Sequence, residues 1–249
     1  NLVGDILVNG TDFVADGQSI TMTSGTQLQT VGNATFTALD AISLETLNIG
    51  GDLDITAKNN VDGLQGSVTL LGAVDTQAMT VLSANGMTLS TDIKATSIDL
   101  DAGTALVADN AITVDALGAL TANAESIDLA KATTTAGSGL MDASNGALTL
   151  GTTTINTSTL GLSSFGAMSL VGDILVNGTD FVADGQSITM TSGTTLNTAG
   201  NATFTALDAI SLETLTMGGD LDVTAQNLSD PTQGSVGFNA SVDTQAMTV

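Results

Sequence analysis

The sequence contains no cysteine, histidine, tryptophan, tyrosine or arginine among its 249 residues. Without cysteine and histidine, the chain cannot form disulfide bonds, thiolate nucleophiles, Ser-His-Asp triads or the usual zinc sites. Its only basic residues are Lys58, Lys94 and Lys131, against 26 acidic residues, and the formal net charge is -23. Because phosphate backbones and anionic lipids attract basic surfaces, we expect neither nucleic acid nor an anionic membrane as a partner.

Long apolar runs are also missing. No apolar stretch approaches the ~20 residues needed to span a bilayer, so we expect no membrane insertion of this segment. The first residues, NLVGDILVNG, lack an initiator methionine and the basic region of a signal peptide. We therefore expect an excerpt from a longer array. With 42% hydrophobic residues, the chain can bury a core, which argues against disorder despite its charge.

A long internal repeat dominates what is present. Residues 2–26 return letter for letter at residues 170–194, a spacing of 168 positions. The ungapped match continues to the last residue, and 64 of the 81 aligned positions are identical. Repetition on this scale is typical of solenoids and arrays. We predict one repeat unit at 1–168 and the start of a second at 169–249, in a continuous solenoid without a true domain boundary.

Within the repeat, short segments alternate between aliphatic and polar residues. Residues 19–23, 41–45, 52–56 and 97–100 are examples. An alternation with period two predicts β-strands that bury the aliphatic side chains on one face and expose threonine, serine or aspartate on the other. Glycine and asparagine lie between these segments, as in Gly32-Asn33 and Asn145-Gly146, and they favour turns. Helix signals are almost absent.

The spacing of these segments predicts how they stack. Leu148, Met168 and Ile188 lie 20 residues apart, and Met79 and Ile98 lie 19 apart. This spacing suits a parallel β-solenoid with ~17–20 residues per coil, in which equivalent strands stack about 4.8 Å apart. We therefore predict an all-β fold, a right-handed parallel β-helix whose interior consists of columns of small aliphatic side chains.

Several segments resemble the repeats of filamentous-haemagglutinin-type exoproteins, which include long bacterial adhesins and contact-dependent inhibition proteins. The resemblance is carried by GDLDITA at 51–57, NATFTA at 33–38 and AESIDLA at 124–130. It is a resemblance of repeat style that covers nearly the whole chain. It implies a right-handed parallel β-helix that is exported and displayed at the cell surface, and it supplies no catalytic residues. The irregular strand spacing and the strong acidity depart from the more regular arrays of that family.

Pairs of aspartates at i and i+2 are the main candidates for chemistry. Each pair lies on one strand face. Paired carboxylates can hydrolyse glycosides, and carboxylate oxygens bind hard cations such as Ca²⁺. We favour a solvated outer face over both, and assign no catalytic or cofactor-binding residue. We retain weak, multi-site Ca²⁺ or Mg²⁺ binding between molecules as a hypothesis. The metal candidates are Asp52, Asp54, Asp99, Asp101, Asp220 and Asp222.

Two further hypotheses for the outer face are an ice-binding surface and an enzyme. Thr-x-Thr pairs such as Thr21/Thr23 and Thr35/Thr37 suggest an ice-binding surface. Such a surface requires the same pair at the equivalent position of every coil. A β-helix enzyme that degrades polysaccharides would need a cleft with clustered Lys, Arg or carboxylates and aromatic residues that stack on the substrate. The presence of only three lysines and the lack of arginine, tyrosine and tryptophan argue against it. We therefore expect no enzyme.

The expected function is mechanical. We predict a structural extracellular fibre that supports adhesion, cell–cell contact or biofilm matrix. The expected partners are other copies of the chain, laterally or end to end, and a polysaccharide or a neighbouring cell surface. The alternative is the stalk of a secreted adhesin or toxin-delivery exoprotein whose active tip lies outside this segment.

Overall fold

The computed structural model of the chain describes residues 1–58, 66–226 and 234–249. These residues form 31 strands and contain no helix. The chain divides into two compact units, Asn1–Ala124 and Glu125–Val249. The end of the predicted sequence repeat, at residue 168, lies inside the second unit.

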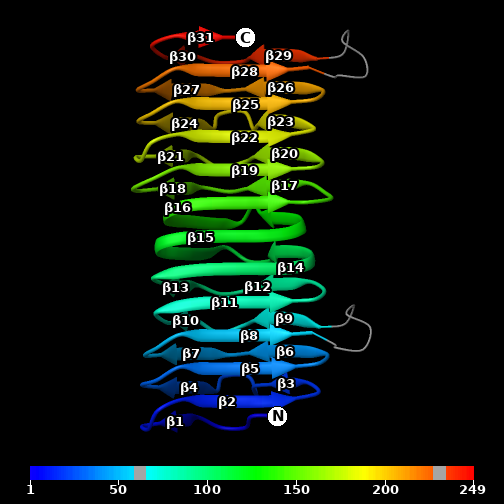
Figure 1. The fold of residues 1–249 in the computed structure, drawn as a ribbon, viewed down its shortest axis with the longest axis vertical. Helices are drawn as coiled ribbons and strands as arrows, with labels where there is room; N and C mark the ends of the chain where they lie inside the picture. The colour runs from blue at the N-terminus through cyan, green and yellow to red at the C-terminus, as the bar shows by residue number, and fades with distance from the viewer. Residues whose placement is uncertain (59–65, 227–233) are drawn as a thin grey trace. The chain divides into compact units, whose positions relative to one another are not determined.

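Each coil consists of three short strands that lie on three faces, here named A, B and C in chain order. Every strand pairs in parallel with the equivalent strand of the neighbouring coil, as Ile20 of one coil does with Ile42 of the next. In Figure 1, face B of the first unit (blue to cyan) lies nearer the viewer, with faces A and C behind it. The chain crosses face B from left to right, returns behind and climbs to the next coil, so the winding is right-handed. The predicted right-handed parallel β-helix is confirmed.

In the first unit, face A contains β1 (Ile6–Val8), β4 (Gln27–Thr30), β7 (Thr46–Ile49), β10 (Val74–Asp75), β13 (Ile93–Ala95) and the start of β15 (Ile112–Leu129). Face B contains β2 (Phe13–Gly17), β5 (Ala34–Ala38), β8 (Leu53–Ala57), β11 (Ala78–Ser83) and the first half of β14 (Ser97–Ala108). Face C contains β3 (Ile20–Thr21), β6 (Ala41–Leu44), β9 (Ser67–Leu70), β12 (Met87–Leu89) and the second half of β14.

In the second unit, face A contains the first half of β16 (Ala132–Ala143), β18 (Thr153–Ile155), β21 (Ile174–Val176), β24 (Thr195–Thr198), β27 (Thr214–Met217) and β30 (Val242–Asp243). Face B contains the second half of β16, β19 (Leu160–Ser164), β22 (Phe181–Gly185), β25 (Ala202–Ala206), β28 (Leu221–Ala225) and β31 (Met247–Thr248). Face C contains the end of β15, β17 (Leu148–Leu150), β20 (Ala167–Leu170), β23 (Ser187–Met190), β26 (Ala209–Leu212) and β29 (Ser235–Phe238).

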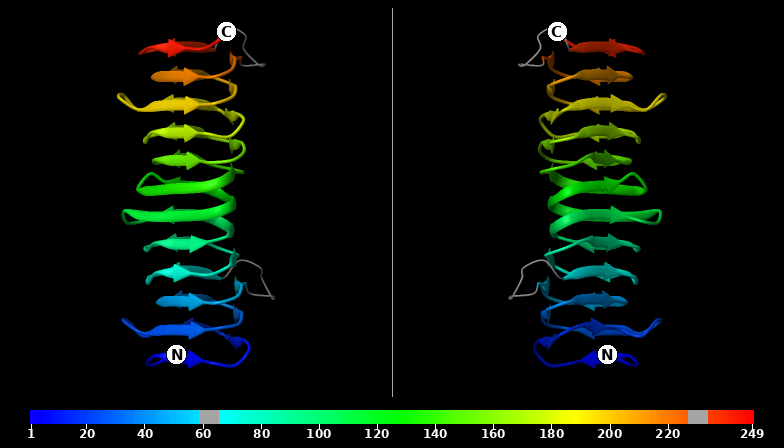
Figure 2. Two further views of the ribbon diagram at one scale, coloured as in Figure 1. Left: turned by 90° about the vertical axis from the view of Figure 1, so that its left-hand side faces the viewer. Right: turned by 90° about the vertical axis from the view of Figure 1, so that its right-hand side faces the viewer.

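The coils are slightly longer than the sequence predicted. Met79 pairs with Ile98, and Leu148, Met168 and Ile188 form one column, as expected from their spacing. Other paired residues are up to 22 positions apart, as Ile20 and Ile42 are. Pairs that enclose residues 59–65 or 227–233 are 26 or 27 positions apart. Figure 2 shows the coils of each unit as parallel layers.

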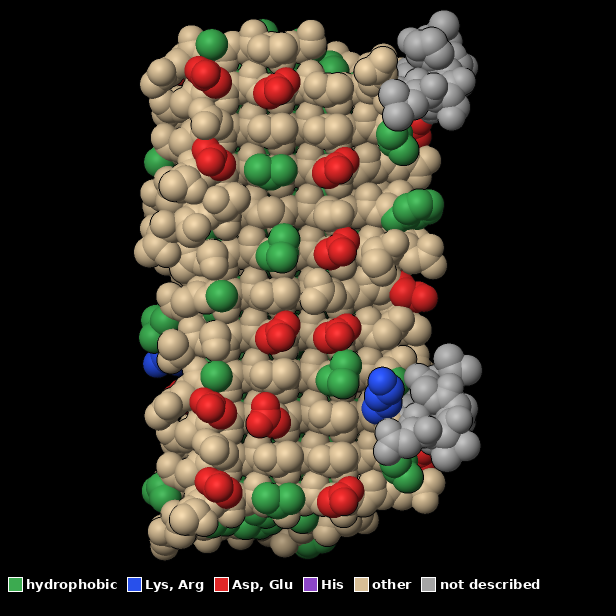
Figure 3. Space-filling view, viewed as in Figure 1, with side chains coloured by type: hydrophobic (Ala, Val, Ile, Leu, Met, Phe, Trp, Pro, Cys, Tyr) green, Lys and Arg blue, Asp and Glu red, His purple; other side chains and the backbone are tan. Residues whose placement is uncertain are grey.

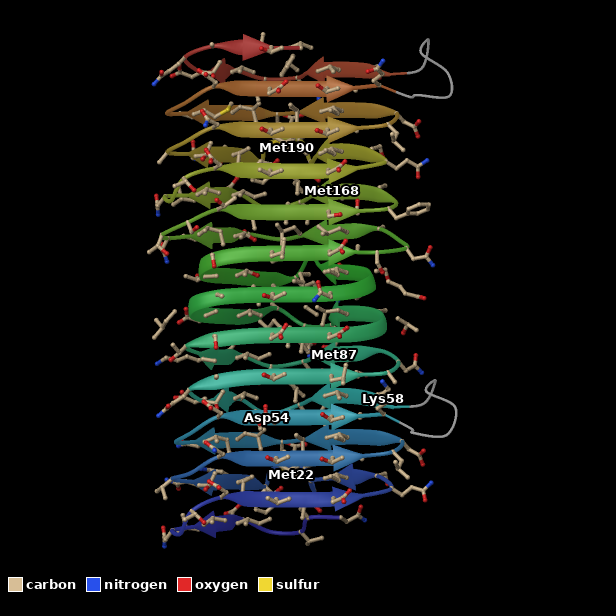
Figure 4. All side chains as sticks on the ribbon, in the orientation of Figure 1. Met22, Asp54, Lys58, Met87, Met168 and Met190 are labelled. Atoms are coloured by element: carbon tan, nitrogen blue, oxygen red, sulfur yellow. The ribbon has the colours of Figure 1, made fainter. Side chains whose placement is uncertain are left out.

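The interior holds the aliphatic columns that the alternating pattern predicts. Leu28 and Leu47 of face A, Leu53 and Ile55 of face B, and Leu44 of face C are at most 1% exposed. Full burial of one such side chain contributes about 1.5–3 kcal/mol, and only stacked coils achieve it. Inward-pointing methionines add to the interior on face C. Asp54 on face B and Lys58, which directly follows β8, are exposed. Figure 4 labels Met22, Met87, Met168, Met190, Asp54 and Lys58.

The interior is not made of small aliphatic side chains alone. Phe36, Phe181 and Phe204 are fully buried. Alanine makes the space, because Ala15 lies opposite Phe36 and Ala183 lies opposite Phe204 in the paired strands. The rings of Phe181 and Phe204 pack at a centroid distance of 5.2 Å. At these three positions, an alanine on one neighbouring coil accommodates the large side chain.

The corner between faces A and B requires glycine because the coils approach closely there. A Cβ atom on Gly32 would lie 1.8 Å from the carbonyl oxygen of Thr11, and one on Gly200 would lie 1.4 Å from that of Thr179. A contact below 3 Å forces the backbone to shift. The predicted turn signal Gly32-Asn33 therefore marks a corner between stacked strands.

Candidate functional site: the acidic surface

The aspartates at the corners have a structural role. Their carboxylates accept hydrogen bonds from backbone N–H groups of the following coil. Asp12 Oδ1 accepts from the N–H of Asn33 at 3.0 Å, and Asn33 Oδ1 accepts from the N–H of Asp52 at 2.9 Å. Asp180, Asn201 and Asp220 repeat this ladder in the second unit. Each bond satisfies a corner N–H that the strand ladders do not reach, and hydrogen bonds to charged groups are among the stronger ones.

A second corner uses the same device. Asp5 Oδ1 accepts a hydrogen bond from the N–H of Gln27 at 3.0 Å, and Asp92 Oδ1 accepts one from the N–H of Thr113 at 2.7 Å. Asp173 Oδ1 accepts from the N–H of Thr195 at 2.8 Å and from its hydroxyl at 3.1 Å. Sequence reasoning missed these ladders. The signal was present, because Asp12, Asn33 and Asp52 each directly precede a strand of face B at coil spacing.

The predicted metal candidates fall into two groups. Asp54, Asp99, Asp101 and Asp222 point outward from face B, and Asp52 and Asp220 lie at the A–B corner just before β8 and β28. All six of these residues are exposed. Within residues 1–58, 66–226 and 234–249, no three His, Cys, Asp or Glu side chains gather closely enough to hold a metal ion. The hypothesis of cation binding between molecules is untested by a single chain and stays a prediction.

Face B carries its carboxylates on alternate coils. In the first unit, the outward residues of one column are Val14, Thr35, Asp54, Thr80 and Asp99 in stacking order. The adjacent column reads Asp16, Thr37, Thr56, Leu82 and Asp101. On face B, coils with an outward aspartate thus alternate with coils that have none. The second unit follows the same rule, with Asp142, Asp184 and Asp222 on every other coil.

This alternation reduces repulsion between like charges. Carboxylates in neighbouring coils would be about 4.8 Å apart, and carboxylates two coils apart are about 9.6 Å apart. The larger distance exceeds the screening length of about 8 Å at physiological ionic strength. Figure 3 shows the red acidic side chains of face B separated by coils that carry none. The solvated outer face expected from the sequence therefore has regularly spaced carboxylates, which the composition alone did not reveal.

Faces A and C differ from face B. On face A of the first unit, Lys94 lies in register between Asp75 and Asp115, so residues of opposite charge occupy neighbouring coils. These three residues line a shallow hollow of about 460 Å³. On face C of the second unit, the outward column is uncharged and hydroxyl-rich from Thr149 to Ser211.

The threonine pairs do not form the continuous ranks that an ice-binding surface requires. Thr35 and Thr37 lie together on face B, but the next coil presents Asp54 and Thr56 at the same positions. Thr21 lies outward on face C, opposite Ser43.

In the described residues, no helix is long and apolar enough to cross a membrane. No protein-family model, curated protein or solved structure matches the chain. What the fold establishes is the class of molecule: the chain is a repeat protein with a parallel β-solenoid fold.

Proposed function

We propose that the chain is a mechanical element, the repeating section of an extracellular fibre or stalk that supports adhesion, cell–cell contact or biofilm matrix. The observation that carries this proposal is the equal register of the two copies of the repeat. Phe13 pairs with Ala34 as Phe181 pairs with Ala202, and Ile20 pairs with Ile42 as Ile188 pairs with Ile210. A further 168-residue unit can therefore continue the same coils without changing them.

Stiffness follows from the interactions between coils. Each coil is joined to the next by backbone hydrogen bonds on three faces and by the columns of buried side chains. The carboxylates of face B limit uncontrolled lateral association, because two such faces repel each other. The neutral, hydroxyl-rich face C has no such barrier. Lateral contact between copies, which we include in the proposal, would therefore use a face other than B.

The experiment compares proteins that contain one, two and three copies of the 168-residue repeat by negative-stain electron microscopy. We expect rods of constant width, with each repeat adding about eight coils of ~4.8 Å, or about 40 Å in length. A matched control shuffles the outward residues of one repeat while keeping the inward ones, and should give the same length. Compact particles, or a length that does not increase with repeat number, would overturn the proposal.

The resemblance to filamentous-haemagglutinin-type exoproteins supports display at the cell surface. It also supports a close variant of the same role, the stalk of a longer adhesin or toxin-delivery protein. The sequence of the parent gene separates the two: a globular tip or toxin domain supports the stalk, and a uniform array supports the fibre. In either case, the expected partners are further copies of the chain and a polysaccharide or a neighbouring cell surface.

Divalent cations enter the proposal only as links between two molecules. Asp54 and Asp99 lie two coils apart, and among the described residues no three carboxylates gather closely enough to hold a metal ion, so a second molecule must complete the ligand set. Light scattering should rise with millimolar Ca²⁺ more than with NaCl of equal ionic strength. The D54N/D99N/D101N protein should lose this difference. Equal scattering in both salts would remove cations from the proposal.

A further inference from the structure

One aromatic side chain of the second unit is exposed. Phe36, Phe181 and Phe204 are fully buried, whereas Phe165 is 71% exposed at the corner that follows β19. The chain contains only six aromatic residues, all of them phenylalanine. Leu207, two coils further on at the same corner, is 49% exposed. Single exposed apolar residues are common, so the surroundings of Phe165 decide whether it has a role.

Phe165 and Leu207 line a hollow of about 540 Å³ on face B of the second unit. Asp142, Ser163 and Asp184 also line it, and they are in register on three successive coils. The two aspartates are therefore about 9.6 Å apart, and the short side chain of Ser163 leaves the space between them open. The hollow thus contains two carboxylates, separated by one coil, together with the aromatic ring of Phe165 and the aliphatic side chain of Leu207.

The carboxylates of Asp142 and Asp184 have no partner among the residues that the structure describes. Unlike Asp173 and Asp180 at the corners, neither Asp142 nor Asp184 accepts a hydrogen bond or forms an ion pair within the part of the chain that the structure describes. By sequence, Lys131 is the only basic residue between positions 125 and 249, and it does not line the hollow. The hollow therefore offers unneutralised negative charge beside apolar surface.

We propose that this hollow binds primary alkylammonium groups. An ammonium group donates up to three hydrogen bonds, which carboxylates accept with the added strength of opposite charge. The aliphatic stem packs on Phe165 and Leu207, and the cation is further attracted to the aromatic ring face. A linear diamine with a four-carbon spacer has the length to reach from Asp142 to Asp184 across Ser163. The same chemistry is carried by free polyamines and by lysine side chains.

The first unit contains a matched control. Asp54 and Asp99 flank Thr80 in register, just as Asp142 and Asp184 flank Ser163. The two pairs have the same spacing along the stack, but Asp54 and Asp99 lie one column nearer the A–B corner. On the coil between them, Ala84 follows Ser83, whereas Phe165 follows Ser164 in the second unit. A comparison of the two pairs therefore separates a built hollow from general attraction to an acidic surface.

The test titrates the whole chain, labelled with fluorophenylalanine, with 1,4-diaminobutane at low ionic strength. The ¹⁹F resonance of Phe165, assigned by its loss in Phe165→Ala, should shift on binding, and those of buried Phe181 and Phe204 should not. Calorimetry gives the dissociation constant. We expect D142N and D184N each to raise it about tenfold and Phe165→Ala to raise it about threefold. We expect D54N/D99N to change it less than twofold.

Circular dichroism and thermal unfolding of each variant check that the solenoid remains folded; the substitutions are at exposed or half-exposed positions, so we expect no change. Equal weakening by D54N/D99N and by D142N or D184N would overturn the proposal in favour of general charge attraction. So would the absence of a shift at Phe165. Tighter binding of 1,4-diaminobutane than of Nα-acetyl-lysine amide assigns a free polyamine. Equal or tighter binding of the lysine derivative assigns a lysine side chain.

Discussion

Residues 2–26 and 170–194 have the same sequence but not the same surroundings. In the second copy, Phe181, Ala183 and Ile174 are at most 1% exposed, whereas the equivalent Phe13, Ala15 and Ile6 are only partly buried. The outward valines differ as well, since Val14 is 71% exposed and Val182 is 40% exposed. The second copy is covered by a coil on each side, and the first copy has a coil only on the side of residues 27–44.

The strand pairing toward the following coil is nevertheless equal in both copies. Phe13 pairs with Ala34 and Phe181 pairs with Ala202, with the same register. The lower burial of the first copy therefore follows from the side on which no coil covers it. A coil keeps its strand pairing with one neighbouring coil, but it needs two neighbouring coils to bury its side chains. Such dependence on the adjacent repeats is typical of repeat proteins.

The largest expected effect is at the buried ring. Phe181→Ala removes a fully buried side chain and its contact with Phe204, and we expect it to cost about 3–5 kcal/mol. Phe13→Ala should cost less than half of this, because Phe13 is partly exposed. The midpoint of urea unfolding of each variant measures the difference. Equal midpoints would show that the preceding coil contributes no burial.

A second pair of variants tests close packing between coils. A Cβ atom on Gly178 would lie 1.9 Å from the carbonyl oxygen of Ser158, whereas nothing lies within 4 Å of one on Gly10. Gly178→Ala should therefore lower stability by about 1–3 kcal/mol. Gly10→Ala, at the equivalent position, should be close to neutral. If thermal unfolding shows both variants equally impaired, the glycine is required by the turn and not by the neighbouring coil.

The corner aspartates should behave alike in both copies, because they bond to the following coil. We expect Asp5→Ala and Asp173→Ala each to cost about 1 kcal/mol. The second cost should be slightly the larger, because Asp173 Oδ1 also accepts from the hydroxyl of Thr195 at 3.1 Å. Amide hydrogen exchange at Gln27 and Thr195 reports each lost bond directly. Unchanged exchange at both amides would contradict the proposed ladder.

The smallest expected effect concerns the alternation of charge on face B. Thr37→Asp and Thr205→Asp each place a carboxylate beside an existing one, Asp16 or Asp184, on the neighbouring coil. We expect both variants to lose about 0.2–1 kcal/mol at low salt, equally in the two copies. The loss should largely disappear in about 0.5 M NaCl, where charges are screened. Thr37→Asn and Thr205→Asn are the uncharged controls, and a loss in these would exclude repulsion as the cause.

Much of the fold was predictable because burial imposes a pattern on the sequence. The alternation around Ile20, Ile42 and Leu53 predicted the strands and their inward faces, and the spacing of Leu148, Met168 and Ile188 predicted one column. The three-faced coil and its length were not predictable in detail. The register between coils depends on how many residues each corner takes, and polar corner residues follow no simple period.

The site was less predictable than the fold. The aspartates that cap backbone N–H groups, such as Asp12, and those that face solvent, such as Asp54, look alike in sequence. Whether an aspartate caps a backbone N–H group or faces solvent depends on the residues that become its neighbours once the chain has coiled. Thr153 shows the same limit, because it points inward and is fully buried although threonine elsewhere marks the outer face.

Cysteine cross-linking tests the stacking register most directly, because the natural chain has no cysteine. Thr205 and Thr224 are paired on neighbouring coils of face B, and both are exposed. In a parallel stack their Cα atoms lie about 4.8 Å apart, within the range that a disulfide bridges. The control pair, Thr203 and Thr224, is out of register by two residues and about 8 Å apart, beyond that range. The account predicts rapid oxidation of the T205C/T224C protein and little of the T203C/T224C protein; equal yields, or the reverse order, would contradict the in-register parallel coil.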